Sequence, residues 1–146
     1  GYADELLRVL APSGYLAVAD WNRRDPADGA MNRLERLVMQ QLLEQWAHPE
    51  FASIQSLQRH LEGSRHAAGI RIDTADWSQA TLPSWFDSIA EGARRPAAIL
   101  GLGPQALVAA LREVPTILLM QWAFATGLMQ FGVFRSRQPA IKAGNP

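Results

Sequence analysis

The residues of this chain that could bind a ligand or take part in chemistry are aromatic and acidic side chains at the ends of expected elements. Trp21, Trp77 and Trp85 each lie just past an element end, where a tryptophan can equally form a pocket wall or simply pack. Trp46 and Trp122 fit the apolar stripes of helices, so we expect them in the core. The three element-end tryptophans are therefore the candidates for a binding pocket.

Asp20, Asp73 and Asp76 lie at or near the ends of expected strands. Carboxylates in such places can be catalytic, but short acidic side chains also cap loops, and we favour that role. The histidines lie in polar contexts, so we expect them at the surface, and no nucleophile-elbow signature accompanies them. They are His48, His60 and His66.

Two other site types have weak support. Gly101-Leu102-Gly103-Pro104 is only slightly similar to a phosphate loop, because Pro104 lacks an N–H and no strand is expected before it, so we predict a hinge. With no cysteine and three scattered histidines, no metal site is predicted.

The spacing of apolar residues predicts an α/β chain. Tyr15–Ala19 is a continuous apolar run ending at Asp20-Trp21, typical of a parallel strand covered on both faces. Residues 70–75 alternate in polarity, which predicts a strand with one solvent-exposed face, and 129–137 is expected to form the last strand. The expected helices span about 4–10, 30–47, 54–67, 82–94, 105–112 and 115–126.

Length and charge exclude several classes of protein. With 146 residues the chain is the size of one domain. Fourteen basic and fourteen acidic residues give no net charge, which argues against a nucleic-acid partner. Val114 to Phe134 holds no charged residue, but Pro115, Gly127 and two glutamines interrupt it. We expect a buried helix and a strand there, or a surface for a lipophilic ligand, rather than a transmembrane span.

Two groups of motifs carry a family resemblance. The sequence ELLRVLAPSG from Glu5 to Gly14, followed by Tyr15–Trp21, resembles the helix, turn and fifth strand of class I S-adenosylmethionine-dependent methyltransferases, with Ser13 replacing the first glycine of the turn. Downstream, the Trp after the strand, an Arg-Asp loop, HPEF, ADWS, a Pro–Trp pair and FGVFRSRQP are similar to tocopherol and related prenylquinol methyltransferases. The resemblance covers nearly the whole chain but only the C-terminal half of that family's length.

The resemblance implies a partial Rossmann-like fold. Residues 1–146 would form a single domain, the acceptor-side part of a methyltransferase without the N-terminal cofactor-binding half. A three-stranded mixed sheet would hold Met129–Arg137 antiparallel in the middle, between Tyr15–Trp21 and Ile70–Asp76, with five or six helices. The family holds S-adenosylmethionine on a glycine-rich loop that has no counterpart here, so the chain alone is expected neither to bind the cofactor tightly nor to be active.

The function implied is methylation of a lipophilic small molecule such as a prenylated phenol. Trp21, Trp77 and Trp85 would surround the acceptor ring, Ser78 would make a polar contact, and the helices within 105–126 would shelter an apolar tail. No residue is assigned as general base or as any other catalytic group. The alternative is a non-catalytic module that binds a lipid or a partner protein.

Further expectations concern assembly and location. Without the first half of the fold, Tyr15–Ala19 becomes an apolar edge strand, and such an edge favours pairing with another chain. We therefore predict a homo-oligomer formed through this edge or through the apolar helices. The expected location is the cytoplasm, with peripheral contact to a membrane as an option.

Overall fold

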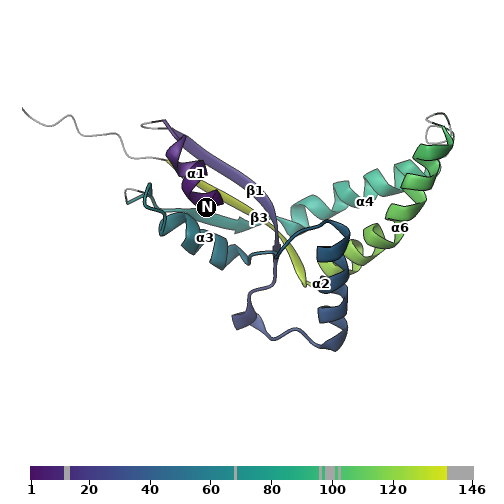
Figure 1. Cartoon of the computed structure of the whole chain (residues 1–146), viewed down its shortest axis with the longest axis horizontal. Helices are drawn as coiled ribbons and strands as arrows, with labels where there is room; N and C mark the ends of the chain where they lie inside the picture. The colour runs from purple at the N-terminus through teal and green to yellow at the C-terminus, as the bar shows by residue number, and fades with distance from the viewer. Residues whose placement is uncertain (12–13, 68, 96, 98–100, 102, 138–146) are drawn as a thin grey trace, which may run out of the picture.

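Three strands form one sheet in the order that the resemblance implied. The computed structural model of the chain (Figure 1) describes residues 1–11, 14–67, 69–95, 97, 101 and 103–137. In it β1 (Tyr15–Arg23), β2 (Asp73–Asp76) and β3 (Met129–Arg137) are arranged β1-β3-β2. Both outer strands pair antiparallel with β3, β1 over all nine of its residues. The partial Rossmann-like arrangement predicted through the resemblance is confirmed.

One prediction about β1 is wrong. The apolar run indicated a parallel strand covered on both faces, whereas β1 pairs antiparallel and its side chains alternate in burial. Leu16 and Asn22 are buried on one face, while Ala17 and Ala19 on the other face are exposed. Alanine is small enough to be tolerated on either side, so an alanine-containing run does not reveal which face is covered.

The helices of the N-terminal half begin at capping side chains. They are α1 (Tyr2–Arg8), α2 (Arg33–Gln45) and α3 (Ile54–Glu62), with a short 3-10 helix at Pro26–Asp28. Asn32 and Glu35 form a capping box before α2, and the hydroxyl of Ser53 accepts from the N–H of Ser56, as its predicted N-cap role requires. α3 ends at Glu62 rather than near residue 67, because Gly63 follows it directly as its C-cap.

Two hydrophobic clusters hold the elements together. α1 and α3 cover one face of the sheet, where Leu16 and Phe134 meet Leu57 and Leu61. A second cluster joins α2 to the C-terminal half through Leu42 and Met120, together with Met129 at the start of β3. The second cluster therefore fixes the far end of the sheet, where strand β1 ends and strand β3 begins.

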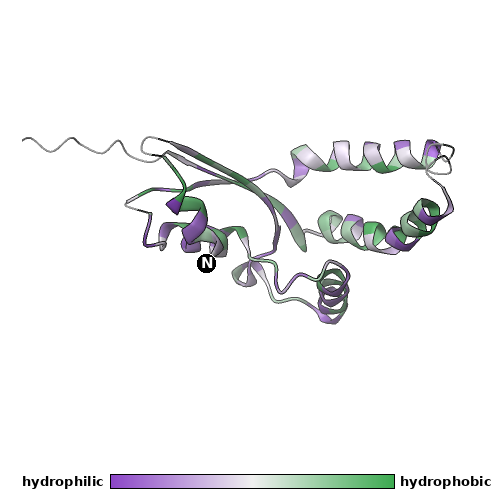
Figure 2. Cartoon of the chain, turned by 45° about the horizontal axis from the view of Figure 1, so that its top comes forward, coloured by the Kyte–Doolittle hydropathy of each residue, from purple (hydrophilic) through white to green (hydrophobic). Residues whose placement is uncertain are grey.

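A pair of long helices projects from that end. α4 (Ser78–Arg94) and α6 (Pro104–Ala125) run away from the sheet together (Figures 1 and 2). α4 begins four residues earlier than predicted and includes Pro83. α6 is one continuous helix that contains Pro115, where the sequence predicted two helices. The turn predicted at Pro12-Ser13 and Leu102 of the predicted hinge lie outside the described residues.

Candidate functional site

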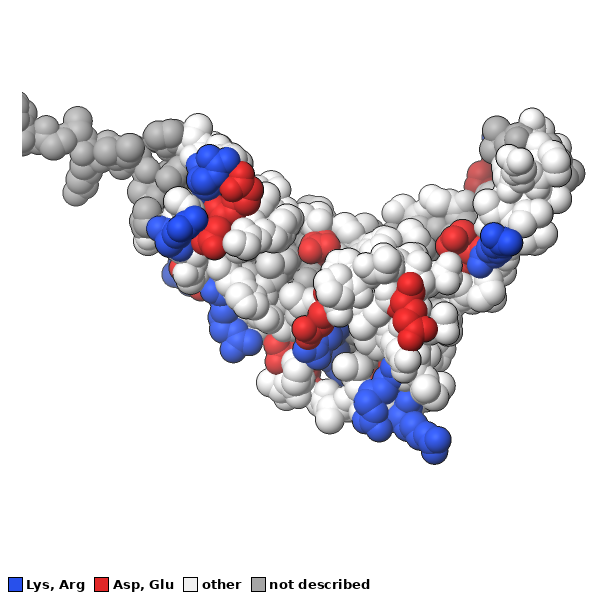
Figure 3. Space-filling view, in the orientation of Figure 1, with Lys and Arg blue, Asp and Glu red and all other residues white. Residues whose placement is uncertain are grey.

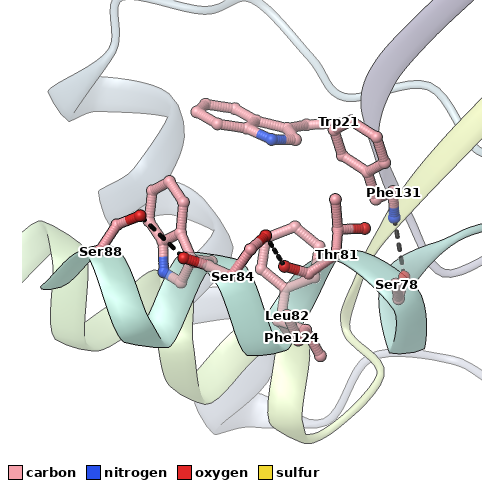
Figure 4. Close-up of a pocket in the computed structure, with 9 residues that line it drawn as sticks. Trp21, Ser78, Thr81, Leu82, Ser84, Ser88, Phe124 and Phe131 are labelled. Atoms are coloured by element: carbon pink, nitrogen blue, oxygen red, sulfur yellow. Dashed lines mark hydrogen bonds between the residues drawn. The ribbon is translucent and has the colours of Figure 1, made fainter. Parts of the chain in front are cut away.

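A cavity of about 200 Å³ lies where the sheet meets α4 and α6. β1, α4, α6 and β3 each contribute to its wall, so it is assembled from segments far apart in the sequence (Figure 4). Its lining is mainly aromatic and hydroxyl-bearing: Trp21, Ser78, Thr81, Leu82, Ser84, Trp85, Ser88, Phe124 and Phe131. An apolar recess with a few polar groups is the usual form of a small-molecule site.

The aromatic wall is built from tryptophans held against one another. Trp21 stacks on Trp46, with ring centroids 4.5 Å apart, and meets the edge of Trp85 at 6.3 Å. Phe51 then packs edge-on to Trp46, with centroids 6.4 Å apart. Offset-stacked and edge-on contacts of this kind favour fixed ring orientations. Trp21 is therefore presented to the cavity in a defined position (Figure 4).

Three hydroxyl groups face the cavity from α4 at helical spacing. Ser84 Oγ donates to the carbonyl of Thr81 at 2.8 Å, Ser88 Oγ donates to that of Ser84 at 2.8 Å, and Thr81 Oγ1 donates to the carbonyl of Trp77 (Figure 4). Each hydroxyl proton is thus committed to the backbone of the preceding turn. The three hydroxyl oxygens can therefore only accept hydrogen bonds from a ligand, which suits a ligand that carries hydrogen-bond donors.

The indole of Trp85 provides a complementary group. Its Nε1–H is buried and has no hydrogen-bond partner among the described residues. Buried donors are nearly always paired, so an unpaired one next to a cavity calls for a partner supplied by a ligand or water. Trp85 therefore contributes its ring to the cavity lining and a buried donor for which the described residues supply no partner.

Three of the four residues proposed from the sequence line this cavity: Trp21, Trp85 and Ser78. The Ser78 hydroxyl is already engaged, because it donates to Asp76 Oδ1 at 2.5 Å and accepts from the N–H of Phe131 at 2.8 Å. Trp77 is 51% exposed and is not part of the lining. Its backbone makes the contacts instead: the N–H donates to the carbonyl of Phe131 at 2.8 Å, and the carbonyl accepts from Thr81 Oγ1.

The carboxylates at the strand ends make local contacts. Asp76 accepts from the N–H of Ser78 at 2.8 Å, and Asp20 accepts from the N–H of Trp21 at 2.9 Å. Gln130 also donates to Asp76 Oδ2, at 3.2 Å. In the part of the chain that the structure describes, no group of three His, Asp or Glu residues could hold a metal ion. Asp76 therefore serves the capping role favoured from the sequence, whereas Asp20 lies inside β1, opposite Gly132, and not at a strand end as predicted.

A buried polar contact fixes the end of β1 beside the site. Asn22 is fully buried; its Oδ1 accepts from the N–H of Gly132 at 3.1 Å, and its Nδ2 donates to the carbonyl of Ala52 at 3.2 Å. A Cβ on Gly132 would lie 2.1 Å from Asn22 Oδ1, so only glycine fits there. This contact ties β1, β3 and the segment before α3 together next to Trp21.

The loop after β1 is held by two carboxylates. Ser53 Oγ donates to Asp25 Oδ2 at 2.5 Å, and this bond, with a second from the N–H of Ala27, lowers the pKa of Asp25. The pKa of Glu35 is also lowered, first by its hydrogen bond from Arg24 at 2.9 Å and then by that from the N–H of Asn32. Both carboxylates therefore favour the ionised form, and both act in the scaffold rather than in the cavity.

A glycine-rich nucleotide cradle is not formed by the described residues. β1 leads into the 3-10 helix at Pro26–Asp28, and β2 leads directly into α4 through Trp77. Gly103 precedes α6 with a φ of 94°, but Pro104 removes an N–H at the helix start. Close backbone approach to a nucleotide needs free N–H groups after a strand. These residues do not fit the family's cofactor, and we assign them no contact with it.

A second, larger groove adjoins the cavity. It encloses about 560 Å³ between α4 and α6 and is lined almost entirely by apolar side chains, including Ile89, Leu107 and Leu111. Trp85 and Ser88 line both the groove and the cavity. The two spaces therefore adjoin along one face of α4.

The cavity also contains residues that sequence reasoning missed. The hydroxyls of Thr81, Ser84 and Ser88 recur at helical spacing, but the helix was expected to begin only at Leu82, which hid their common face. Phe124 and Phe131 come from α6 and β3, and no local pattern links those segments to α4. A helix starting at Ser78 would have revealed the hydroxyl row.

Comparison with known proteins shows which proteins this chain is similar to. No family model matches the chain. The chain is 48% identical, over 143 residues, to a protein of Synechocystis sp. named 2-methyl-6-phytyl-1,4-hydroquinone methyltransferase. The match covers 97% of this chain and 45% of that protein, so the chain spans about half the length of this curated relative.

Solved structures share the fold at low sequence identity. One is the structure of a putative sarcosine dimethylglycine methyltransferase from Galdieria sulphuraria, with a TM-score of 0.67 and 16% sequence identity. That match covers 95% of this chain and 47% of the Galdieria chain. Another is the structure of a phosphoethanolamine N-methyltransferase from Haemonchus contortus in complex with phosphomonomethylethanolamine and S-adenosylhomocysteine. Its TM-score is 0.72 at 11% sequence identity, and the match covers 94% of this chain and 29% of the Haemonchus chain. The resemblance that the sequence motifs indicated is confirmed: over nearly its whole length this chain is homologous to part of a prenylquinol methyltransferase, and it has the fold of the corresponding part of methyltransferases.

Proposed function

We propose that this chain is the acceptor-binding part of an S-adenosylmethionine-dependent methyltransferase that acts on a lipophilic phenol or hydroquinone. The observation that carries the proposal is the 48% identity to a 2-methyl-6-phytyl-1,4-hydroquinone methyltransferase, which extends over 97% of the chain and so over the segments that form the cavity. The prediction that these residues correspond to the acceptor-side part of such an enzyme remains part of this proposal.

The cavity suits the head of such a molecule. At about 200 Å³ it is smaller than the roughly 300–1,000 Å³ typical of sites for drug-sized ligands, so a single ring is the appropriate occupant. Trp21 and Trp85 provide aromatic surface for the ring. Phenolic hydroxyls are donors, and the committed hydroxyls of α4 leave acceptor lone pairs for them.

The adjoining groove suits the tail. Its walls are apolar, and burying hydrocarbon contributes roughly 25 cal/mol per Å² removed from water. Because Trp85 and Ser88 border both spaces, a molecule with its ring in the cavity would place its tail in the groove directly beside it. A prenylated ring is the class of ligand that uses both.

The contribution of these residues to the reaction is positioning. In the family, S-adenosylmethionine supplies an electrophilic methyl group, and the described residues of this chain do not form its cradle. Their part is to hold the acceptor ring in one orientation, which can lower a barrier by several kcal/mol, up to about 11. Trp21 is suited to this task because Trp46 stacks on it and the Asn22 contact fixes its strand. No described cavity residue is assigned as a general base.

Binding measurements test the proposal and its alternative. Isothermal titration with a prenylated hydroquinone should show binding, and phytol, which has the tail without the ring, should bind more weakly. Equal affinity for both compounds would favour the non-catalytic lipid-binding module, since the ring would then add nothing. Absence of binding to either compound would contradict the proposed function and the lipid-binding form of the alternative, and would leave a module that binds a partner protein.

Two further expectations remain proposals. β1 is an edge strand of the described sheet, and we propose that the chain self-associates through this edge or through the apolar helices. Sedimentation should then show an oligomer, and a clean monomer at roughly tens of micromolar would contradict it. The chain as isolated is also proposed to bind S-adenosylhomocysteine weakly or not at all, which calorimetry would detect.

A further inference from the structure

α6 carries two apolar faces on opposite sides, and only one of them is used within the fold. Its inner face packs into the second hydrophobic cluster through Met120, Ala123 and Phe124. The opposite face, which we call the α6 stripe, consists of exposed Val108, Leu111, Val114 and Leu118. Side chains three and four positions apart share a helix face, so these four form one continuous apolar strip.

The stripe belongs to an arm that is mostly free of charge. α6 is apolar enough and long enough to cross a membrane by composition, yet only 17% of its most apolar window is buried. Figure 2 shows α6 mainly in the colour of hydrophobic residues, and Figure 3 shows the arm largely white. At its far end Arg94 and Arg95 both pair with Glu91, at 3.8 and 2.5 Å, so these three residues together carry one positive charge.

A transmembrane arrangement does not fit this helix. Arg112 and Glu113 are adjacent in its middle and both are exposed, and charged side chains at the centre of a bilayer cost at least about 2.5 kcal/mol each. Its inner face is moreover occupied by α2, whose Leu42 lies in the same cluster as Met120. A helix held to a folded body on one side and apolar on the other can lie along a membrane surface, with its outer face in the lipid.

We infer that the α6 stripe docks the protein onto a lipid bilayer, with the groove between α4 and α6 open to the lipid. Leu111, Val114 and Leu118 belong to the stripe and also line the groove. The surface that would enter the bilayer is therefore the rim of the groove, and lipid chains can fill an apolar groove of irregular shape. The stripe has no charged group that could set the register of a protein partner, and a lipid surface needs none.

Docking would connect the bilayer to the cavity. A prenylated molecule is dissolved in the membrane, and the groove leads from the stripe to Trp85 and Ser88 at the cavity wall. The acceptor could pass from lipid to the aromatic site without exposing its tail to water. This consequence rests on the proposed function, whereas docking itself does not.

The test is flotation with phosphatidylcholine vesicles, with and without phosphatidylglycerol, in low and high salt. The double variant Leu111→Glu/Leu118→Glu places two charges on the stripe. The matched control is Leu34→Glu/Leu37→Glu on α2: these leucines are 57% and 58% exposed, against 62% and 58% for the stripe pair. Circular dichroism confirms that both variants remain folded.

The wild type and the α2 control should float with both kinds of vesicle, and high salt should change this little, because the contact is apolar. The stripe variant should lose about tenfold or more in partition coefficient. Equal flotation of both variants, or none by the wild type, would overturn the inference. Conversion of a wild-type dimer to a monomer by the stripe variant alone would instead assign the stripe to a second copy and also overturn it.

The outcome is separable from that of the proposed function. A hydroquinone without a prenyl tail fills only the cavity, whose lining includes neither Leu111 nor Leu118, so its affinity should be the same for the stripe variant and the α2 control. Loss of flotation with unchanged affinity supports docking. Flotation without any hydroquinone binding would leave docking standing and contradict the proposed function.

Discussion

Single side chains define the candidate site, and Trp85 has the most specific expected role. Its buried Nε1–H has no partner among the described residues, so a ligand oxygen should accept from it. Trp85→Phe keeps an aromatic ring but removes this donor, and we predict a loss of hydroquinone affinity of about 0.5–1.5 kcal/mol, roughly 2- to 13-fold, in isothermal titration. Trp77→Phe, at an exposed tryptophan outside the lining, is the control and should bind like the wild type. Equal affinities would remove Trp85 from the site.

Asn22 is predicted to be the polar side chain on which the end of β1 depends most. Asn22→Ala would leave the N–H of Gly132 and the carbonyl of Ala52 without their side-chain partner in a buried place, at a cost of about 1–3 kcal/mol per group left unsatisfied. Urea denaturation should show this loss. Gln40→Ala, which removes only an exposed bond to Glu44, should change stability by no more than about 0.5 kcal/mol. A similar stability for both variants would contradict the role given to Asn22.

At the residue scale, the sequence could predict which tryptophans matter but not where their rings point. Trp21 and Trp85 line the cavity as proposed, but they lie inside β1 and α4 rather than just past an element end. Trp77 does lie at an element end, as the N-cap of α4, yet its backbone bonds to β3 and its ring remains in solvent. The free N–H of Trp85 depends on which atoms surround it after folding, and no sequence pattern carries that information.

At the scale of elements, Pro115 distinguishes the predicted pair of helices from the observed single one. Inside a helix a proline lacks the N–H that would bond to the carbonyl of Leu111, whereas at the first position of a helix it is favourable. Pro115→Ala should therefore raise the free energy of unfolding by about 1–3 kcal/mol in urea denaturation. A decrease would indicate that Pro115 starts a helix, as the sequence predicted, and would contradict a continuous α6.

The loop between β1 and α2 should make stability depend on acid pH. The pKa values of Asp25 and Glu35 are lowered in the folded protein by their hydrogen bonds, from Ser53 and Arg24 first. A lowered folded-state pKa means that the stabilisation is present above the unfolded values, near 4, and is lost as the pH falls through the folded values. The melting temperature should decline there.

Variants of single carboxylates test which groups cause the fall in melting temperature at acid pH. Asp25→Asn and Glu35→Gln should each be less stable than the wild type at neutral pH and should show a shallower fall in melting temperature on acidification. Asp73→Asn, at an exposed strand residue, should retain the full slope. If all three variants kept the wild-type slope, these two carboxylates would not be the groups responsible.

The periodicity of apolar residues predicted which segments form helices and strands far better than it predicted where those elements begin and end. The stripe of α2 and the Ser53 cap predicted α2 and α3, and β3 has the predicted bounds. Pro83 and Pro115 led to wrongly predicted helix starts, because proline usually marks a helix start and here both prolines lie inside helices. Tertiary packing overrides that local preference, and in α6 it acts through the inner face that contacts α2.

At the scale of the whole molecule, the sheet order could not be derived from periodicity. The apolar run of β1 indicated a parallel strand, and only the resemblance placed Met129–Arg137 antiparallel in the centre. Local patterns report which residues are apolar, while strand order depends on contacts between segments about a hundred residues apart. The cavity shares this property, since it draws on β1, α4, α6 and β3 at once.

The central claim is that the aromatic cavity holds the ring of a lipophilic acceptor. The most direct measurement is a titration of the chain with a short-chain prenylated hydroquinone, followed through the five indole N–H resonances in nitrogen-15 NMR spectra. The account predicts that the resonances of Trp21 and Trp85 shift together and saturably, while that of exposed Trp77 stays in place. Saturable shifts confined to Trp77 or Trp122, or no shift at Trp85, would contradict it.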